Sequence, residues 1–527
     1  MKNWLHNKFS IRMVSIAGWW AVCAPSVYAD TIDNAHACLD MSDLQCAINI
    51  RDAELATHPN DIKVRQLHAR TLFYEGRYQE MVEILDALDS TGDGLLENGG
   101  FPAHATQAAF LGMTETQGKG VRVRYDPGLD RILIQGAVET LELSSVVYDK
   151  IFGGIPNHDL VVDIYPTAQR FIDASGIPPE AVRTTGVIAL SKWNRLLLTS
   201  PRATAGGYGW RDTAAHEYVH LVVSWRSKDK APVWLQEGLA KYLERSWRGE
   251  REDYLSVYQQ SLLAKALKDN SFVPFEKFAL SMAYLDSGEE ASLAYAQVAT
   301  MVAFVQSKAG DAAFPIMMDR LATGEKAEIV VADLAGYKNF ADFTAAWKKY
   351  VANIPLVKSN LASMPVALDG EGGLYSDDPV LNNREDLAKH VRLGDLLVEK
   401  KLYDAAIIEY KKVEESEDIV SPNVLARLAL CYSYLHKMPL AMTTIEKGIG
   451  MYPEHAFVLQ TAAQLYTKQG QKKKALEMWE QAEEIEPYDI ETQQALVDLY
   501  QEFSQPEKAK RHQEYLNILQ VGGAYYR

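Results

Sequence analysis

The feature that most restricts the fold of this chain is a 34-residue period in its C-terminal part. Tyrosines and alanines both recur at this interval, at Tyr432, Tyr466 and Tyr500 and at Ala441, Ala475 and Ala509. Pro453 and Pro487 are separated by the same number of residues. A helical unit of this length buries its apolar face only against the next unit, so the units must stack in series. The period therefore predicts an all-helical solenoid.

The small residue in the second helix and the proline at the end of each unit resemble the tetratricopeptide repeat. Ala405, 36 residues before Ala441, marks an earlier unit, so we expect about four units over residues 385–520. The resemblance implies a peptide or protein partner on the concave face. A spacer or a dimerisation arm is the alternative, because a solenoid fold does not by itself establish a ligand.

The first 29 residues have the layout of a secretory signal peptide. Three basic residues precede an apolar run over residues 13–24, and Ala29 is followed by Asp30. Cleavage after Ala29 would export the chain to the periplasm or the extracellular space. An uncleaved membrane anchor is the alternative, but the run is shorter than the ~20 residues that span a bilayer. We therefore expect no transmembrane segment after signal cleavage.

Export would bring the cysteines into an oxidising compartment, where disulfides persist. Cys38 and Cys46 are close enough in sequence to staple a short helical hairpin. Cys431 lies in an apolar helical run and is expected to be a buried free thiol. The odd number of cysteines leaves other pairings open.

The composition is that of a globular protein of several domains. The chain has 527 residues, with 47% hydrophobic and 24% charged residues, enough for about two to four domains. Its formal net charge of −16 would repel phosphates over most of the surface, which excludes nucleic acid as a partner.

The apolar pattern changes twice along the rest of the chain. Residues 30–110 have helical, tetratricopeptide-like spacing, and residues 115–355 change to a mixed α/β pattern. We expect strands at 121–125 and 160–165 and a hairpin formed by 185–190 and 195–199. Prolines, glycines and aspartates over residues 356–384 predict a linker to the repeats.

Two histidines define the candidate site. His216 and His220 lie one turn apart on an expected helix that runs to about Ser227, with Asp212 as its N-terminal cap. This spacing lets two imidazoles reach one metal ion, and Glu217, beside the first histidine, can reach a water on that ion. Two helical histidines that bind nothing are the alternative.

A third ligand is needed, because a catalytic zinc usually holds three protein ligands and a water, and two histidines with a glutamate are one known set. Pro232 starts the next expected helix, and Glu237 follows about one and a half turns later. If this helix packs back antiparallel on the first, Glu237 faces the histidines. Gly238 would then let these two helices approach closely.

A resemblance to a known family is carried by the segments HEYVH and WLQEGLAKYLE. They resemble the gluzincin metallopeptidases, the clan of thermolysin, and especially its peptidase-MA-like proteins, which often carry tetratricopeptide repeats. The resemblance covers about residues 118–352. It implies an α+β, thermolysin-like zincin fold with a small mixed sheet plus helices, Zn²⁺ held by His216, His220 and Glu237, and Glu217 as general base.

The resemblance also implies hydrolysis of peptide bonds, with Arg195 to Ser200 as an edge strand that pairs with an extended substrate. Tyr295 is the candidate that stabilises the oxyanion, with an ordinary core tyrosine as the alternative; Tyr242 and Tyr208 are weaker candidates. The G-x-M-E-N signature by which large zinc aminopeptidases hold a free amino terminus is absent from the sequence. Its absence favours an endopeptidase.

The sequence therefore predicts an exported zinc peptidase whose repeats bind substrates or protein partners. The competing hypothesis is a catalytically inactive tetratricopeptide adaptor in an envelope assembly or quality-control complex. The complete set of two histidines, a glutamate ligand and a base favours the peptidase, because an inactive site has no physical need for all four.

Overall fold

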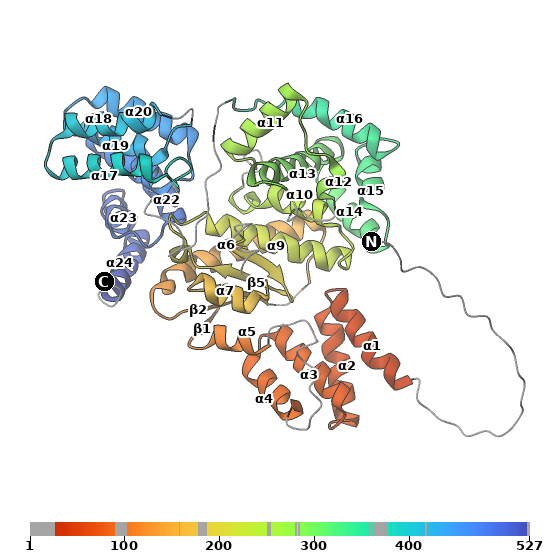
Figure 1. The fold of residues 1–527 in the computed structure, drawn as a ribbon. Helices are drawn as coiled ribbons and strands as arrows, with labels where there is room; N and C mark the ends of the chain where they lie inside the picture. Colours follow the sequence, from red (N-terminus) through yellow and green to blue (C-terminus); the bar gives the residue numbers. More distant parts are fainter. Residues whose placement is uncertain are drawn as a thin grey trace, which may run out of the picture.

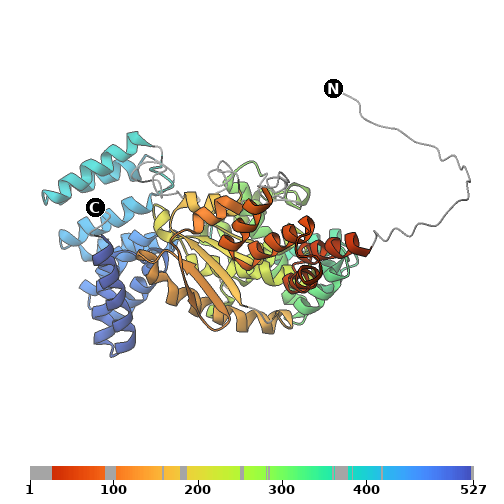
Figure 2. The same ribbon diagram turned by 90° about the horizontal axis from the view of Figure 1, so that it is seen from below.

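The computed structural model describes residues 27–89, 103–156, 159–177, 187–249, 254–279, 282, 285–358, 361, 375, 378–382, 384–416 and 419–523. Almost all of the predicted signal peptide and most of the predicted linker lie outside these residues. Across the described part of the chain, no helix combines the length and the apolar character needed to cross a bilayer. The N-terminal and C-terminal helices lie on opposite sides of a central α/β region (Figures 1 and 2).

The centre of the molecule is a five-stranded sheet with the strand order β1-β2-β3-β5-β4. Its strands are β1 (Thr114–Gln117), β2 (Val121–Tyr125), β3 (Leu160–Tyr165), β4 (Ala189–Lys192) and β5 (Arg195–Thr199). The three middle strands run parallel, and both outer strands are antiparallel to their neighbours. The predicted strands at 121–125 and 160–165 are confirmed, and so is the hairpin, although its first strand begins at Ala189.

The expectation that Arg195 to Ser200 forms the edge strand is wrong. Strand β5 lies between β3 and β4, and all five of its residues are buried. The hairpin turns at Trp193 and Asn194, whose φ angles of 54° and 61° are both positive, as a tight two-residue hairpin turn requires. The turn folds β4 back along the outer side of β5, so β4 is the free edge.

Within the described residues, five helices precede the first strand. They are α1 (Val27–Asp40), α2 (Leu44–Thr57), α3 (Ile62–Glu75), α4 (Tyr78–Asp89) and α5 (Ala103–Phe110). A disulfide between Cys38 and Cys46 joins the end of α1 to the start of α2, which confirms the expected staple. Cys431 is a buried free thiol, also as expected.

A buried charge cluster fixes the N-terminal helices to the sheet. Asp163 in β3 is fully buried, and its carboxylate lies 2.6 Å from Arg124 Nε and 3.6 Å from Arg195 Nε. The two guanidinium groups also donate to carbonyls at the C-terminal end of α3: Arg124 to that of the cap residue Gly76 at 2.9 Å, and Arg195 to that of Phe73 at 2.7 Å. The Phe73 carbonyl also accepts from the Gly76 N–H at 3.1 Å, and the negative end of the helix dipole favours cations at this end of α3.

The remaining helices of the central region pack on the sheet and on one another. They are α6 (Ile134–Phe152), α7 (Ala168–Ser175), α9 (Trp210–Ser227), α10 (Val233–Leu243), α11 (Val257–Asp269), α12 (Phe275–Phe278), α13 (Gly288–Ala309), α14 (Ala313–Ala322), α15 (Ala327–Leu334) and α16 (Phe340–Val351), with short 3₁₀ turns η2 (Leu129–Leu133), η3 (Pro201–Ala203) and η4 (Ser246–Arg248). One hydrophobic core runs from the sheet through α6 and α9 to α16. The mixed α/β prediction for this region is confirmed.

The C-terminal part consists of helix pairs. The helices are α17 (Glu385–Glu399), α18 (Tyr403–Glu414), α19 (Pro422–Tyr434), α20 (Met438–Met451), α21 (Ala456–Lys468), α22 (Lys472–Ile485), α23 (Ile490–Glu502) and α24 (Pro506–Gly523). The starts of α19, α21 and α23 are spaced by 34 residues, as are those of α20, α22 and α24. The structure thus has the predicted period, with Ala441, Ala475 and Ala509 buried. The assignment of these helix pairs to the tetratricopeptide family stays a prediction.

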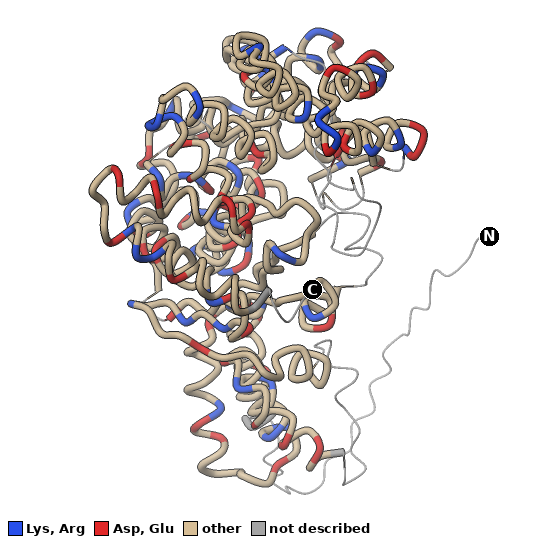
Figure 3. The backbone as a smooth tube through the Cα atoms, turned by 90° about the vertical axis from the view of Figure 1, so that its left-hand side faces the viewer, with Lys and Arg blue, Asp and Glu red and all other residues tan. Residues whose placement is uncertain are grey.

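The last helices of this array are docked on the central region. The Tyr488 hydroxyl donates to Asp130 Oδ1 at 2.6 Å, Arg248 pairs with Glu484 at 2.8 Å, and Tyr515 belongs to the central core. Lys and Arg are interspersed with Asp and Glu along the part of the chain that Figure 3 colours. The docking thus combines polar pairs with the apolar packing of Tyr515 and Leu519 against the central core.

A cavity of about 350 Å³ lies within this junction, and Glu483 is one of its lining residues. Burial raises the pKa of Glu483 to about 7, and the neighbouring Glu484 adds to the rise, while Arg211 and Arg511 oppose it. A glutamate titrates near 4.3 in an unfolded chain. Because the folded-state pKa is the higher one, Glu483 destabilises the fold increasingly as the pH rises from about 4.3 to about 7.

Replacing Glu483 by Gln should therefore raise Tm by roughly 2 °C at pH 8, with the gain vanishing towards pH 4. Thermal unfolding of both proteins at several pH values measures this difference. Glu484→Gln is the matched control: it loses ion pairs with Arg211 and Arg248 and should lower Tm at pH 8. A gain from Glu483→Gln that does not change with pH would contradict the prediction.

Candidate metal centre

Helix α9 begins two residues before Asp212, which corrects the predicted cap. The N-terminal cap is Gly209. Asp212 lies in the first turn, where a carboxylate interacts favourably with the helix dipole. Its Oδ1 accepts hydrogen bonds from Trp247 Nε1 at 3.0 Å and Arg248 Nε at 2.8 Å. Asp212 thus links the metal-binding helix to η4 instead of capping it.

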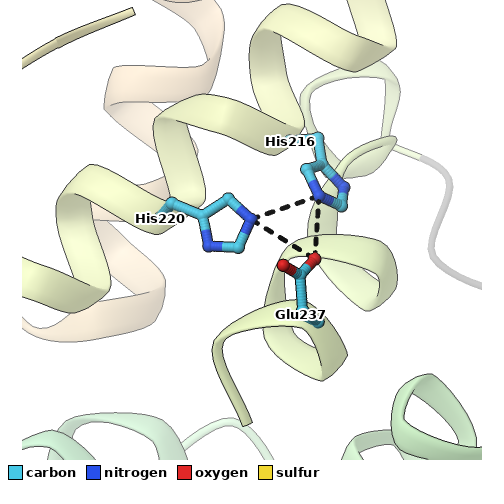
Figure 4. Close-up of side chains that lie close together, drawn as sticks. All are labelled: His216, His220 and Glu237. Carbon is cyan, nitrogen blue, oxygen red and sulfur yellow. Dashed lines mark hydrogen bonds and ion pairs between the residues drawn. The ribbon is translucent and has the colours of Figure 1, made fainter. Parts of the chain in front are cut away.

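His216 and His220 face the same side of α9, and Glu237 of α10 faces both of them (Figure 4). The two Nε2 atoms are 3.3 Å apart, and Glu237 Oε2 lies 3.5 Å from each. Three ligands of a tetrahedral zinc with bonds of about 2.0–2.1 Å are about 3.3–3.4 Å apart. The three side chains therefore fit a zinc ion in both chemistry and spacing.

Helix α10 brings Glu237 into position. Gly238 allows a close helix contact here, but the partner helix is not the one that the sequence indicated. Pro232 is the cap residue before α10. A Cβ atom on Gly238 would lie 2.8 Å from the carbonyl oxygen of Val298 and 3.0 Å from Val302 Cγ2, both on α13. The glycine therefore allows close approach of α10 to α13, not of α10 to α9.

Glu217 and Tyr295 line the same cavity as the three candidate ligands, a space of about 650 Å³. Burial raises the pKa of Glu217, against the opposing effect of the two histidines. Burial also raises the pKa of Tyr295, with Glu237 and Glu217 adding to the rise, so its hydroxyl keeps its proton as a hydrogen-bond donor. The sequence-predicted residues His216, Glu217, His220, Glu237 and Tyr295 thus come together.

The two weaker tyrosine candidates do not line this cavity. The Tyr208 hydroxyl donates to the carbonyl of Thr199 at 2.5 Å, and the Tyr242 ring packs on Tyr254 with 5.0 Å between ring centres. Of the three tyrosines considered, Tyr295 alone lines the cavity that contains the candidate ligands.

Sequence reasoning missed Glu244, one residue beyond α10. Its Oε2 lies 3.0 Å from His216 Nδ1, and its Oε1 accepts from Lys241 at 2.5 Å. Burial lowers the pKa of His216, but hydrogen bonds with Glu237 and Glu244 outweigh it and raise the pKa to about 10. A carboxylate behind a metal-binding histidine fixes its ring orientation. The signal in the sequence was a second glutamate two helical turns after Glu237.

Residues 144–353 match the family model of the Peptidase MA superfamily. The central region therefore carries a metallopeptidase-like domain of this superfamily. No curated protein matches the chain.

Several solved structures are similar to parts of this chain. MamA is 17% identical over 27% of this chain and 80% of its own, with a TM-score of 0.23. Native yeast LTA4 hydrolase is 13% identical over 77% of this chain and 66% of its own, with a TM-score of 0.31. An M1 zinc metallopeptidase from Deinococcus radiodurans is 20% identical over 45% of this chain and 50% of its own, with a TM-score of 0.28. At TM-scores this low, we draw no conclusion from these likenesses.

Replacing Glu244 by Ala should weaken zinc binding by about 10- to 100-fold, because the His216 ring loses the acceptor that orients it. Competition with a chromogenic chelator measures the affinity. Glu244→Gln, which keeps an acceptor oxygen, should lose less. Equal affinity in all three proteins would show that Glu244 does not position His216.

Proposed function

We propose that this protein is a zinc-dependent peptidase. The observation that carries the proposal is the near-tetrahedral spacing of His216, His220 and Glu237 beside a buried glutamate in one cavity. These three side chains would hold the zinc, which, when bound, lowers the pKa of a water molecule and polarises the scissile carbonyl.

Two side chains would carry out the proton transfer and charge stabilisation. Glu217 accepts a proton from the attacking water and returns it to the nitrogen of the leaving amine. The raised pKa of Glu217 brings its basicity closer to that needed near neutral pH. Tyr295 donates its hydroxyl hydrogen to the carbonyl oxygen as negative charge develops there.

The free edge of β4 would bind the substrate backbone. An extended peptide can add to an exposed strand through main-chain hydrogen bonds, which give affinity without much selectivity for side chains. Residues Ala189 to Asn194 line the cavity that holds the metal group, and Ser191 makes a backbone hydrogen bond with Glu217. The edge strand and the base are therefore close together, as the proposal requires.

Three finer parts of the proposal rest on the sequence: the type of peptidase, its export and the role of the C-terminal array. A gluzincin-type endopeptidase is favoured over an aminopeptidase because the G-x-M-E-N signature is absent. The signal-peptide pattern supports export with cleavage after Ala29, to the periplasm or beyond. The C-terminal array would bind substrates or protein partners through its concave face. The complete group of ligands and base argues against the inactive adaptor.

The decisive test compares the wild-type chain with Glu217→Gln. The mutant should keep about one zinc per chain, because Glu217 is not a ligand, but lose peptide hydrolysis by at least about 10³-fold. Metal analysis and mass spectrometry of a peptide mixture measure the two quantities. Equal hydrolysis by both proteins would refute the mechanism, and zinc-free chains would favour the adaptor.

Tyr295→Phe should lower kcat by about 10²- to 10³-fold with the zinc content unchanged, because one donor to the oxyanion is lost. Tyr208→Phe is the matched control, since its hydroxyl contacts Thr199 outside the cavity, and it should change kcat by less than about threefold. A similar kcat for Tyr295→Phe and the wild type would exclude the oxyanion role.

A further inference from the structure

We propose that the disulfide-linked turn between α1 and α2 is the end wall of the substrate cleft, and that it limits how many substrate residues fit on one side of the metal group. The proposal rests on the proposed peptidase function, because it concerns the substrates of that site. It assigns a role in specificity to a part of the chain that lies outside the segment matched to the Peptidase MA superfamily.

The turn and the metal group line one cavity. Leu39 at the end of α1, Ser42 in the turn, Leu44 at the start of α2 and Tyr74 in α3 share this space of about 650 Å³ with His220 and the other candidate ligands. The size is within the range of roughly 300–1,000 Å³ that ligand pockets occupy. A peptide lying in the cavity would therefore meet the N-terminal helices as well as the catalytic ones.

The wall is held in place at several points. The disulfide closes the turn between Cys38 and Cys46, and Asp43 accepts a hydrogen bond from the Cys46 backbone at 3.0 Å. Ser42 Oγ donates to Asp229 Oδ2 at 3.3 Å. Because Asp229 follows the last residue of α9 by two positions, this bond joins the turn to the far end of the metal-binding helix.

The wall also has an apolar lining. Leu39 and Leu44 pack with Tyr74 in a small cluster around the disulfide. On the hairpin side, Trp193 lines the same cavity, and its ring lies 4.7 Å from that of Phe73. These leucines and rings give the wall apolar surface beside the polar pair of Ser42 and Asp229, so an apolar substrate residue can pack against it.

The length of α9 sets the space between the metal group and the wall. Ser227, the last residue of α9, lies about 10 Å beyond His220 at a rise of about 1.5 Å per residue. An extended peptide spans about 3.3 Å per residue. About three substrate residues therefore fit between the scissile bond and the wall.

The edge strand β4 ends on the side of the cavity where the proposed wall lies. Ser191 is level with Glu217 through its backbone hydrogen bond, and β4 ends at Lys192, before the hairpin turn. The tip of the hairpin is bound to α9, because Trp225 Nε1 donates to Asn194 Oδ1 at 2.7 Å. A substrate that pairs with β4 in the direction of the wall thus loses its pairing partner within a few residues.

The test uses the full-length chain, loaded with zinc and carrying Glu217→Gln, and two ladders of peptides built around one fixed apolar dipeptide. One ladder is lengthened at its N-terminal end and the other at its C-terminal end. Calorimetry measures the affinity for each peptide. One ladder should lose affinity by about 10-fold once it extends more than about three residues past the centre, whereas the other should not.

Variants of Leu44 should move this limit in opposite directions. Leu44→Ala should let longer peptides bind, and Leu44→Phe should make the loss occur with shorter ones. The matched control is Leu55→Ala on the same helix α2, because Leu55 is half-buried against a different cluster and should not move the limit. Two Leu44 substitutions of opposite size keep the test informative if one of them does not fold.

The outcomes separate this proposal from the proposed function. If neither ladder shows a length limit, or if neither Leu44 variant moves the limit, the proposal that the turn is an end wall is wrong. If the peptides bind with the expected limit but the zinc-loaded wild-type chain does not hydrolyse them, the proposed peptidase function is wrong and the proposed end wall is supported. If no peptide binds, both are overturned.

Discussion

The contact between α10 and α13 is the constraint on which the metal group depends. Glu237 can approach two imidazoles of α9 only if α10 lies deep in the helical layer, and the absence of a side chain at Gly238 makes that depth possible. A methyl group there would lie 2.8 Å from the Val298 carbonyl oxygen, which would push α10 outwards. Since the ligand atoms are 3.3–3.5 Å apart, a small displacement would separate the carboxylate from both histidines. Helix packing thus sets the ligand geometry before any metal binds.

The local features of this site could be predicted from the sequence because they arise within single helices. The spacing of His216 and His220 fixes them on one face of a helix, and Pro232 marks the start of the next. The 34-residue period likewise reappears in the helix starts, since each repeat folds as a local unit. Features that depend on partners distant in sequence were predicted less well.

Three errors have this common cause. Asp212 has the residue type of a helix cap, but its carboxylate binds Trp247 and Arg248, and nothing near it in sequence reveals them. The edge strand was misplaced because strand order is decided by pairing across the sheet, and β4 covers β5. Gly238 was correctly identified as a close contact, yet its neighbour is 60 residues away at Val298. The part of the cleft formed by Leu39 and Leu44 was missed for the same reason.

The buried charge cluster of Asp163, Arg124 and Arg195 has a consequence for where domain boundaries can be drawn in this chain. Asp163 supplies one negative charge for two buried guanidinium groups, and the carbonyls at the end of α3 compensate for the excess positive charge. Asp163 and Arg195 lie inside the segment that matches the Peptidase MA superfamily, whereas Arg124 and α3 lie before it. The cluster therefore crosses the start of the matched segment. A buried charge that loses its partners is costly, so a change on one side of that boundary has to be matched by a change on the other.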